Sequence, residues 1–195
     1  MINVTHQNLR RNIGVLGILL PVILAIGNGF DIKPSISHFY YTPMGIVFTG
    51  ILWVFGLLLF SYRGHDRIDN LWTNISGVLI LIVSVIPTSC LPGECNAVNA
   101  HTHAVLNLVH LTCAASFFML MGAMSFFRFS ISKKNRKLYR ICGAMVWVSI
   151  GSLAIDVFFD LKITEIDVFL GESIALFFFG SAWLVKSKSL RSIGL

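Results

Sequence analysis

Charged side chains are scarce in this sequence of 195 residues, of which Asp, Glu, Lys and Arg make up only 12%. A soluble domain carries about 25%. The hydrophobic share is 55% and the mean hydropathy is +0.78, so the chain has more apolar surface than a globular protein of this length can bury. This composition excludes an ordinary soluble domain and indicates an integral membrane protein.

The sequence also lacks the local motifs that identify common enzyme classes. It contains no HExxH of zinc proteases, no GxSxG of α/β-hydrolases and no Walker phosphate-binding loop. Any chemistry must therefore come from side chains that are distant in the sequence and that the fold brings together.

Runs free or nearly free of charge recur at about the length that crosses a bilayer, roughly 20 residues. They cover residues 12–30, 43–62, 70–88, 104–127, 141–159 and 168–185. Short connections join them, without a low-complexity linker. The sequence therefore predicts a single all-α transmembrane domain over residues 1–195, built as a bundle of six transmembrane helices.

The basic residues predict the orientation of this bundle. With a cytoplasmic N-terminus, six spans place all of the 15 Lys and Arg residues except Lys33 and Lys162 on the cytoplasmic side, a strong positive-inside bias. We expect both termini in the cytoplasm and the chain in a bacterial inner membrane. Anchoring and anionic lipid head groups explain the densest basic stretch, residues 127–140, so we expect no nucleic-acid partner.

Two cysteines stand in the predicted outer loop between the third and fourth spans. Cys90 and Cys95 flank a Pro-Gly turn, and His101 and His103 follow. A disulfide or a pair of free thiols is favoured over a Cys/His metal site, because the spacing fits no standard zinc knuckle.

Ionisable and polar residues from several segments share the outer half of this predicted topology. They are His103, Asn107 and His110 on one face of the fourth span, Asp156 and Glu172 in the last two spans, and Ser35 and His38 before the second. An ionised side chain costs about 2.5–3.5 kcal/mol at the middle of the bilayer. Several at one depth therefore indicate one polar cavity open to the outside, with His110 and Glu172 at its centre.

This cavity has three interpretations. In the first, His110, His103 and His38 bind Zn²⁺, Glu172 or Asp156 acts as general base and Ser35 supplies a hydroxyl, giving a hydrolase of a lipid-like substrate. In the second, a transporter or lipid-binding protein uses the same side chains without catalysis. In the third, they are interhelical contacts of a structural partner in a membrane complex.

Six stretches resemble a family of uncharacterised bacterial multispan membrane proteins. They are SISHFYYTPMGIVFTG, FSYRGHDRIDN, SGVLILIVSVIPTS, HLTCAASFFMLMGAMSFF, RKLYRICG and LGESIALFFFGSAWLVK. The likeness covers nearly the whole chain after the first span. It implies the fold and topology rather than a reaction, and it marks Ser35, Tyr40, Tyr41, Asp66, His110, Arg136, Tyr139, Glu172, Trp183 and Lys186. Gly45 and Ile46 stand where the family commonly carries an Arg-Asp pair.

A more distant likeness concerns the membrane hydrolases related to alkaline ceramidases. The arrangement of the polar residues is similar to theirs, in which Ser, His and Asp surround a zinc ion. Those enzymes have seven spans and a His-x3-His element, and this sequence predicts six spans and contains no such element.

Overall fold

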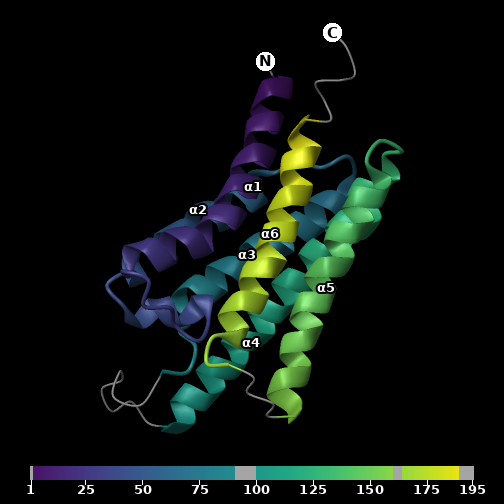
Figure 1. Cartoon of the computed structure of the whole chain (residues 1–195). Helices are drawn as coiled ribbons and strands as arrows, with labels where there is room; N and C mark the ends of the chain where they lie inside the picture. The colour runs from purple at the N-terminus through teal and green to yellow at the C-terminus, as the bar shows by residue number, and fades with distance from the viewer. Residues whose placement is uncertain (1, 91–99, 160–163, 189–195) are drawn as a thin grey trace.

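A computed structural model gives the fold and describes residues 2–90, 100–159 and 164–188 (Figure 1). The long helices are α1 (Ile2–Gly27), α2 (Gly45–Ser61), α3 (Arg67–Val85), α4 (Ala100–Ala123), α5 (Arg136–Phe159) and α6 (Asp167–Lys188). Short helical turns are η1 (Ile36–Tyr41), η2 (Met124–Arg128) and η3 (Phe129–Ile131). These described residues contain no strand, which confirms the predicted all-α class.

Five helices, α1, α3, α4, α5 and α6, are long and apolar enough to cross a membrane. The chain is therefore a multi-pass membrane protein. The predicted second span differs from expectation, because its helix α2 has 17 residues and is shorter than the run 43–62. Residues before Gly45 form a turn that follows η1, and the helix stops at Tyr62, whose backbone is extended.

The six long helices form a closed ring in chain order. Each packs against the next one along the chain, and α6 packs against α1. Glycines allow three of these pairs to approach closely, since a Cβ on Gly14 would lie 2.7 Å from the carbonyl oxygen of Gly180. The pairs are Gly14 and Gly180 between α1 and α6, Gly56 and Gly77 between α2 and α3, and Gly122 and Gly143 between α4 and α5.

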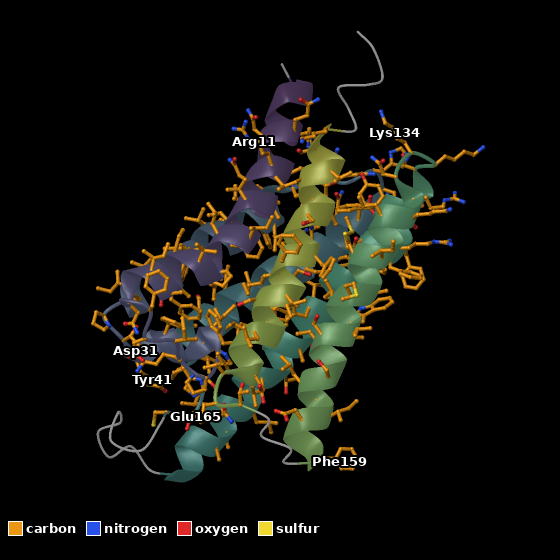
Figure 2. The ribbon with its side chains drawn as sticks, in the orientation of Figure 1. Arg11, Asp31, Tyr41, Lys134, Phe159 and Glu165 are labelled. Carbon is orange, nitrogen blue, oxygen red and sulfur yellow. The ribbon has the colours of Figure 1, made fainter. Side chains whose placement is uncertain are left out.

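The two ends of the ring carry different side chains. Figure 1 shows the start of α1 and the end of α6 at one end, and Figure 2 shows Arg11 and Lys134 there. We call this the basic end. Asp31, Tyr41 and Glu165 lie at the opposite end, which contains η1 and which we call the η1 end.

Aromatic rings fill the interior between the two ends. Phe55 of α2, Phe117 of α4 and Phe179 of α6 are almost completely buried. Their ring centroids are 5.6 Å (Phe55–Phe179), 5.9 Å (Phe55–Phe117) and 6.1 Å (Phe117–Phe179) apart. Alternate helices therefore meet in an apolar centre, which separates the polar groups of one end from those of the other.

Helix α3 begins at the basic end with a side-chain cap. Asp66 is its N-cap residue and accepts a hydrogen bond from the backbone N–H of Asp69 at 3.0 Å. This bond, supported by the Arg128 guanidinium, lowers the pKa of the Asp66 carboxyl below its ordinary value. Arg128 also pairs with Asp69, its Nε lying 2.5 Å from Oδ1. The end of η2, which follows α4, is thus joined to the start of α3.

Candidate functional site

The short helix η1 closes the ring at the η1 end. Ser35 caps it: its Oγ accepts from the backbone N–H of His38 at 3.3 Å and lies 2.7 Å from His38 Nδ1. Ile36, Ser37 and Phe39 are buried, and η1 packs against α1, α2 and α6. A segment that sequence reasoning treats as the entry to the second span is therefore part of the bundle interior.

Glu172 of α6 binds the N-terminus of η1. The first backbone N–H groups of a helix have no partner within it, and Glu172 Oε2 accepts the N–H of Ile36 at 2.7 Å. One turn earlier on α6, the N–H of Phe169 donates to the carbonyl oxygen of Pro34 at 2.8 Å. The first turns of α6 thus replace water as the hydrogen-bond partner of residues 34–36.

His110 of α4 connects η1 to the end of α3. Its Nδ1 lies 2.5 Å from the carbonyl oxygen of Ile86, which can only accept, so Nδ1 carries the proton. Nε2 therefore accepts from the Ser37 hydroxyl, at 2.8 Å. His110 is 2% exposed, and these two partners hold its ring in one orientation.

The loop after α3 completes the site from the other side. The Tyr41 hydroxyl donates to the carbonyl oxygen of Thr88 at 2.6 Å. Asn107 of α4 accepts from the Thr88 hydroxyl at 3.0 Å and from the N–H of Ser89 at 2.9 Å. These bonds fix η1 and α4 to the same four residues, 86–89.

A cavity of about 40 Å³ lies beneath η1. Side chains of α1, α2, α3, α4 and α6 form its walls, and nearly all are apolar, among them Leu52, Phe117 and Phe118. Ser37 and Glu172 are its two polar lining residues. A water occupies about 10–15 Å³ by this kind of measure, so the space holds a small group without movement of the walls.

The structure brings some of the predicted site residues together. His110 and Glu172 do meet at one place, but through neighbouring residues of η1 rather than by contact with each other. Ser35 pairs with His38 instead of entering the cavity. Asp156 is not joined to the others: among the described residues it makes no hydrogen bond, and its buried Oδ1 has no partner there.

Sequence reasoning missed Ser37, the hydroxyl that binds His110. It stands two residues after Ser35, and only the turn geometry of η1 decides which of the two points inward. The spacing Ser35–Ser37–His38 gave no signal that separates them. Thr88 and Ile86 also belong to the network without having been predicted, because the bonds use their backbone carbonyl oxygens. Tyr41 was marked by the family resemblance, but with no partner assigned.

Two of the three predicted zinc ligands, His110 and His38, already form hydrogen bonds in this arrangement. A zinc ligand offers a nitrogen lone pair to the metal, and the Ser37 hydroxyl already uses that of His110 Nε2. Within the described part of the chain, no group of three His, Cys, Asp or Glu side chains is placed to hold a metal ion. The side chain of His103 lies outside the described residues, so its role as a ligand stays a prediction.

A disulfide or a pair of free thiols was expected at Cys90 and Cys95, and the structure describes the first of these two residues. Cys90 is disulfide-bonded, which agrees with an oxidising compartment at the η1 end. Cys95 lies outside the described residues. Cys113 and Cys142 are free thiols inside the bundle.

Comparison of the chain with protein-family models, with curated proteins and with solved structures finds no match. A function must therefore be inferred from the site itself. Its two features are a hydrogen-bonded group of side chains around η1 and an apolar cavity directly beneath it.

Proposed function

We propose that this chain is a six-span protein of the bacterial inner membrane that binds a lipid-like amphiphile beneath η1, on the extracytoplasmic side. The distribution of charge supports the orientation, because Arg11 and Lys134 lie at the end where α1 begins and α6 ends. The 17 residues of α2 span about 26 Å, close to the roughly 30 Å of a hydrocarbon core. Its place in the ring between α1 and α3 supports a sixth span.

The polarity of the cavity is the observation that carries the proposal. Ligand sites are mostly apolar, with a few polar groups that orient the ligand, and here the walls are apolar while Ser37 and Glu172 stand at the side of η1. Glu172 uses Oε2 for the N–H of Ile36. Its Oε1 makes no hydrogen bond to any described residue. A head group that carries a hydroxyl or amine would supply the missing donor.

The position of a groove on the surface of the ring supports a lipid-like ligand. The outer surface of the ring has a groove of about 800 Å³ between α3 and α4. Ala115 lines this groove, and its neighbour Ala114 lines the inner cavity. The two residues are adjacent on α4, so the groove and the cavity lie against neighbouring faces of the same turn of this helix. An acyl chain that enters between α3 and α4 would lie partly in the groove and partly in the cavity.

The interior argues against a transport route. A transporter needs polar groups that continue to the basic end, whereas Phe55, Phe117 and Phe179 fill the centre of the ring. The same rings provide a floor on which an apolar chain end can pack.

Photo-cross-linking tests the proposal. A phospholipid with a diazirine on its acyl chain is added to the protein in nanodiscs, and the labelled residues are mapped by mass spectrometry. We expect labelling of cavity residues such as Leu52 and Phe118, and its loss in Ala114→Phe, which fills the space between groove and cavity. Val148→Phe, on the lipid-facing side of α5 at 61% exposure, is the matched control and should keep it. Labelling confined to the outer surface in the wild-type chain would refute the proposal.

A second candidate function is a metal-independent lipid esterase or acyltransferase. One observation favours it: Ser37, which lines the cavity, donates to His110 Nε2, and the Ile86 carbonyl orients the imidazole through Nδ1. This is the arrangement of a nucleophile, a base and an orienting group. A fluorophosphonate probe should then label Ser37 and fail to label Ser37→Ala, while Ser35→Ala keeps the label. Absence of labelling in the active-site segment of the wild-type chain would remove this candidate.

A further inference from the structure

The basic end contains a second group of side chains that the site around η1 does not use. Four buried aromatic rings form a continuous series there: Tyr62, Trp183, Phe129 and Tyr139. Their successive ring centroids lie 5.0, 5.1 and 5.7 Å apart, with the rings nearly perpendicular. We call this series the basic-end aromatic cluster. It joins the ends of α2 and α6 to η3 and to the first turn of α5.

Two cations lie against this cluster. The Arg10 guanidinium is 5.4 Å from the centroid of Tyr62, and its Nε donates to the Tyr62 hydroxyl at 3.2 Å. The Lys186 ammonium is 5.2 Å from the centroid of Phe129 and 5.7 Å from that of Tyr139. Tyr62 and Tyr139 are the two ends of the series of rings, so both cations border one cluster. Aromatic faces stabilise cations, but they do not neutralise them.

No carboxylate of the described chain compensates these two charges. Neither Arg10 nor Lys186 forms an ion pair with any residue in the ranges 2–90, 100–159 and 164–188. The acidic side chain that acts on Lys186 from nearby, Asp69, is already bound by Arg128 and by the N–H of His65. Asp66 is bound by Arg128 as well. The acidic groups of this end are therefore occupied.

A buried hydroxyl adjoins the same place. Tyr139 is completely buried, and its hydroxyl has no hydrogen-bond partner in the described structure. The Lys186 ammonium lies 5.7 Å from the centroid of its ring. A buried hydroxyl without a partner is unfavourable, and an acceptor placed between the two cations would satisfy it.

We propose that Arg10, Lys186 and the Tyr139 hydroxyl bind a phosphate group, that of an anionic phospholipid in the leaflet at the basic end. All three groups donate hydrogen bonds, and two carry positive charge, so the missing partner is an anion with several acceptor oxygens. Helix ends at the basic side of a membrane lie at the depth of the head groups, where pockets between helices bind anionic lipids. The partly buried position of Lys186 and the aromatic cluster on its other side leave the phosphate group as its counter-ion.

Native mass spectrometry of the whole chain tests this proposal. The protein is released from detergent with phosphatidylglycerol or phosphatidylcholine at known concentrations, and the dissociation constant is taken from the fraction of lipid-bound protein. We expect preference for phosphatidylglycerol, a loss of about fivefold or more in affinity for Arg10→Gln and for Lys186→Gln, and about threefold for Tyr139→Phe. Lys134→Gln removes the same charge from an exposed position of the basic end and should keep wild-type affinity.

The outcomes distinguish lipid binding at this site from a general effect of net charge and from the binding of free phosphate. An equal loss in Lys134→Gln, or no loss in Arg10→Gln and Lys186→Gln, would overturn the proposal. Inorganic phosphate is added at millimolar concentration as a second arm, and displacement of the lipid by it at that level would assign the site to free phosphate instead. Wild-type elution and thermal unfolding of each variant without added lipid show that a lost affinity is not a lost fold.

Discussion

Replacement of His110 by alanine is the sharpest test of how η1 is held. The substitution removes the hydrogen bonds to the Ile86 carbonyl and to the Ser37 hydroxyl, and leaves the partly buried carbonyl and the buried hydroxyl without that partner. Side-chain hydrogen bonds inside membrane proteins average about 0.6 kcal/mol, and a buried group left unpaired costs about 1–3 kcal/mol. With two groups affected and a small cavity left behind, we expect a loss of about 2–4 kcal/mol.

The assay is unfolding in mixed detergent micelles combined with hydrogen exchange of residues 34–41. Leu111→Ala is the matched control, because it truncates the next residue of α4, which is 51% exposed on the lipid side. We expect His110→Ala to lower the free energy of unfolding and to speed exchange in η1, and Leu111→Ala to do neither beyond about 0.5 kcal/mol. Equal stability of His110→Ala and the wild type, or unchanged exchange in η1, would refute the role of His110 as its anchor.

Three further predictions test other parts of the structure. Glu172→Gln retains an oxygen that can accept from η1 and should cost less than about 0.5 kcal/mol, whereas Glu172→Leu should cost about 1–3 kcal/mol in the same unfolding assay. Gly14→Leu places a side chain against the backbone of α6 and should cost about 2 kcal/mol or more by thermal unfolding, while Gly50→Ala, which meets open space, should be neutral. The pKa of Asp66 is lowered in the folded chain, so its contribution is present at neutral pH and is lost as pH falls through that lowered pKa. Asp66→Asn should therefore flatten the acid limb of a plot of unfolding temperature against pH.

The spans could be predicted because they depend on composition alone. Charge-free runs of membrane-spanning length correspond to the helices, and the distribution of Lys and Arg fits the end at which the termini lie. The second span was predicted too long, because hydropathy does not show that residues 42–44 form a turn after η1. A turn of apolar residues and a helix of apolar residues look alike in a sequence.

Of the site, the sequence predicted only the depth of its residues in the membrane. Topology placed His110, Glu172 and Asp156 in the outer half, but depth says nothing about the direction in which a side chain leaves its helix. His110 and Glu172 face η1, and Asp156 joins neither. The family resemblance marked Tyr139, Trp183 and Lys186 at the basic-end aromatic cluster but gave them no role. Membrane topology already accounts for Arg10 and Lys186 as positive charges, so their positions against buried aromatic rings could not be predicted.

The binding of a lipid-like amphiphile beneath η1 is tested most directly by an experimental structure of the protein in lipid nanodiscs, at a resolution that shows bound lipid. The claim predicts continuous density from the groove between α3 and α4 into the cavity beneath η1, with its polar end within hydrogen-bond distance of Glu172 Oε1. A well-ordered η1 above a cavity that is empty or contains only water would contradict it.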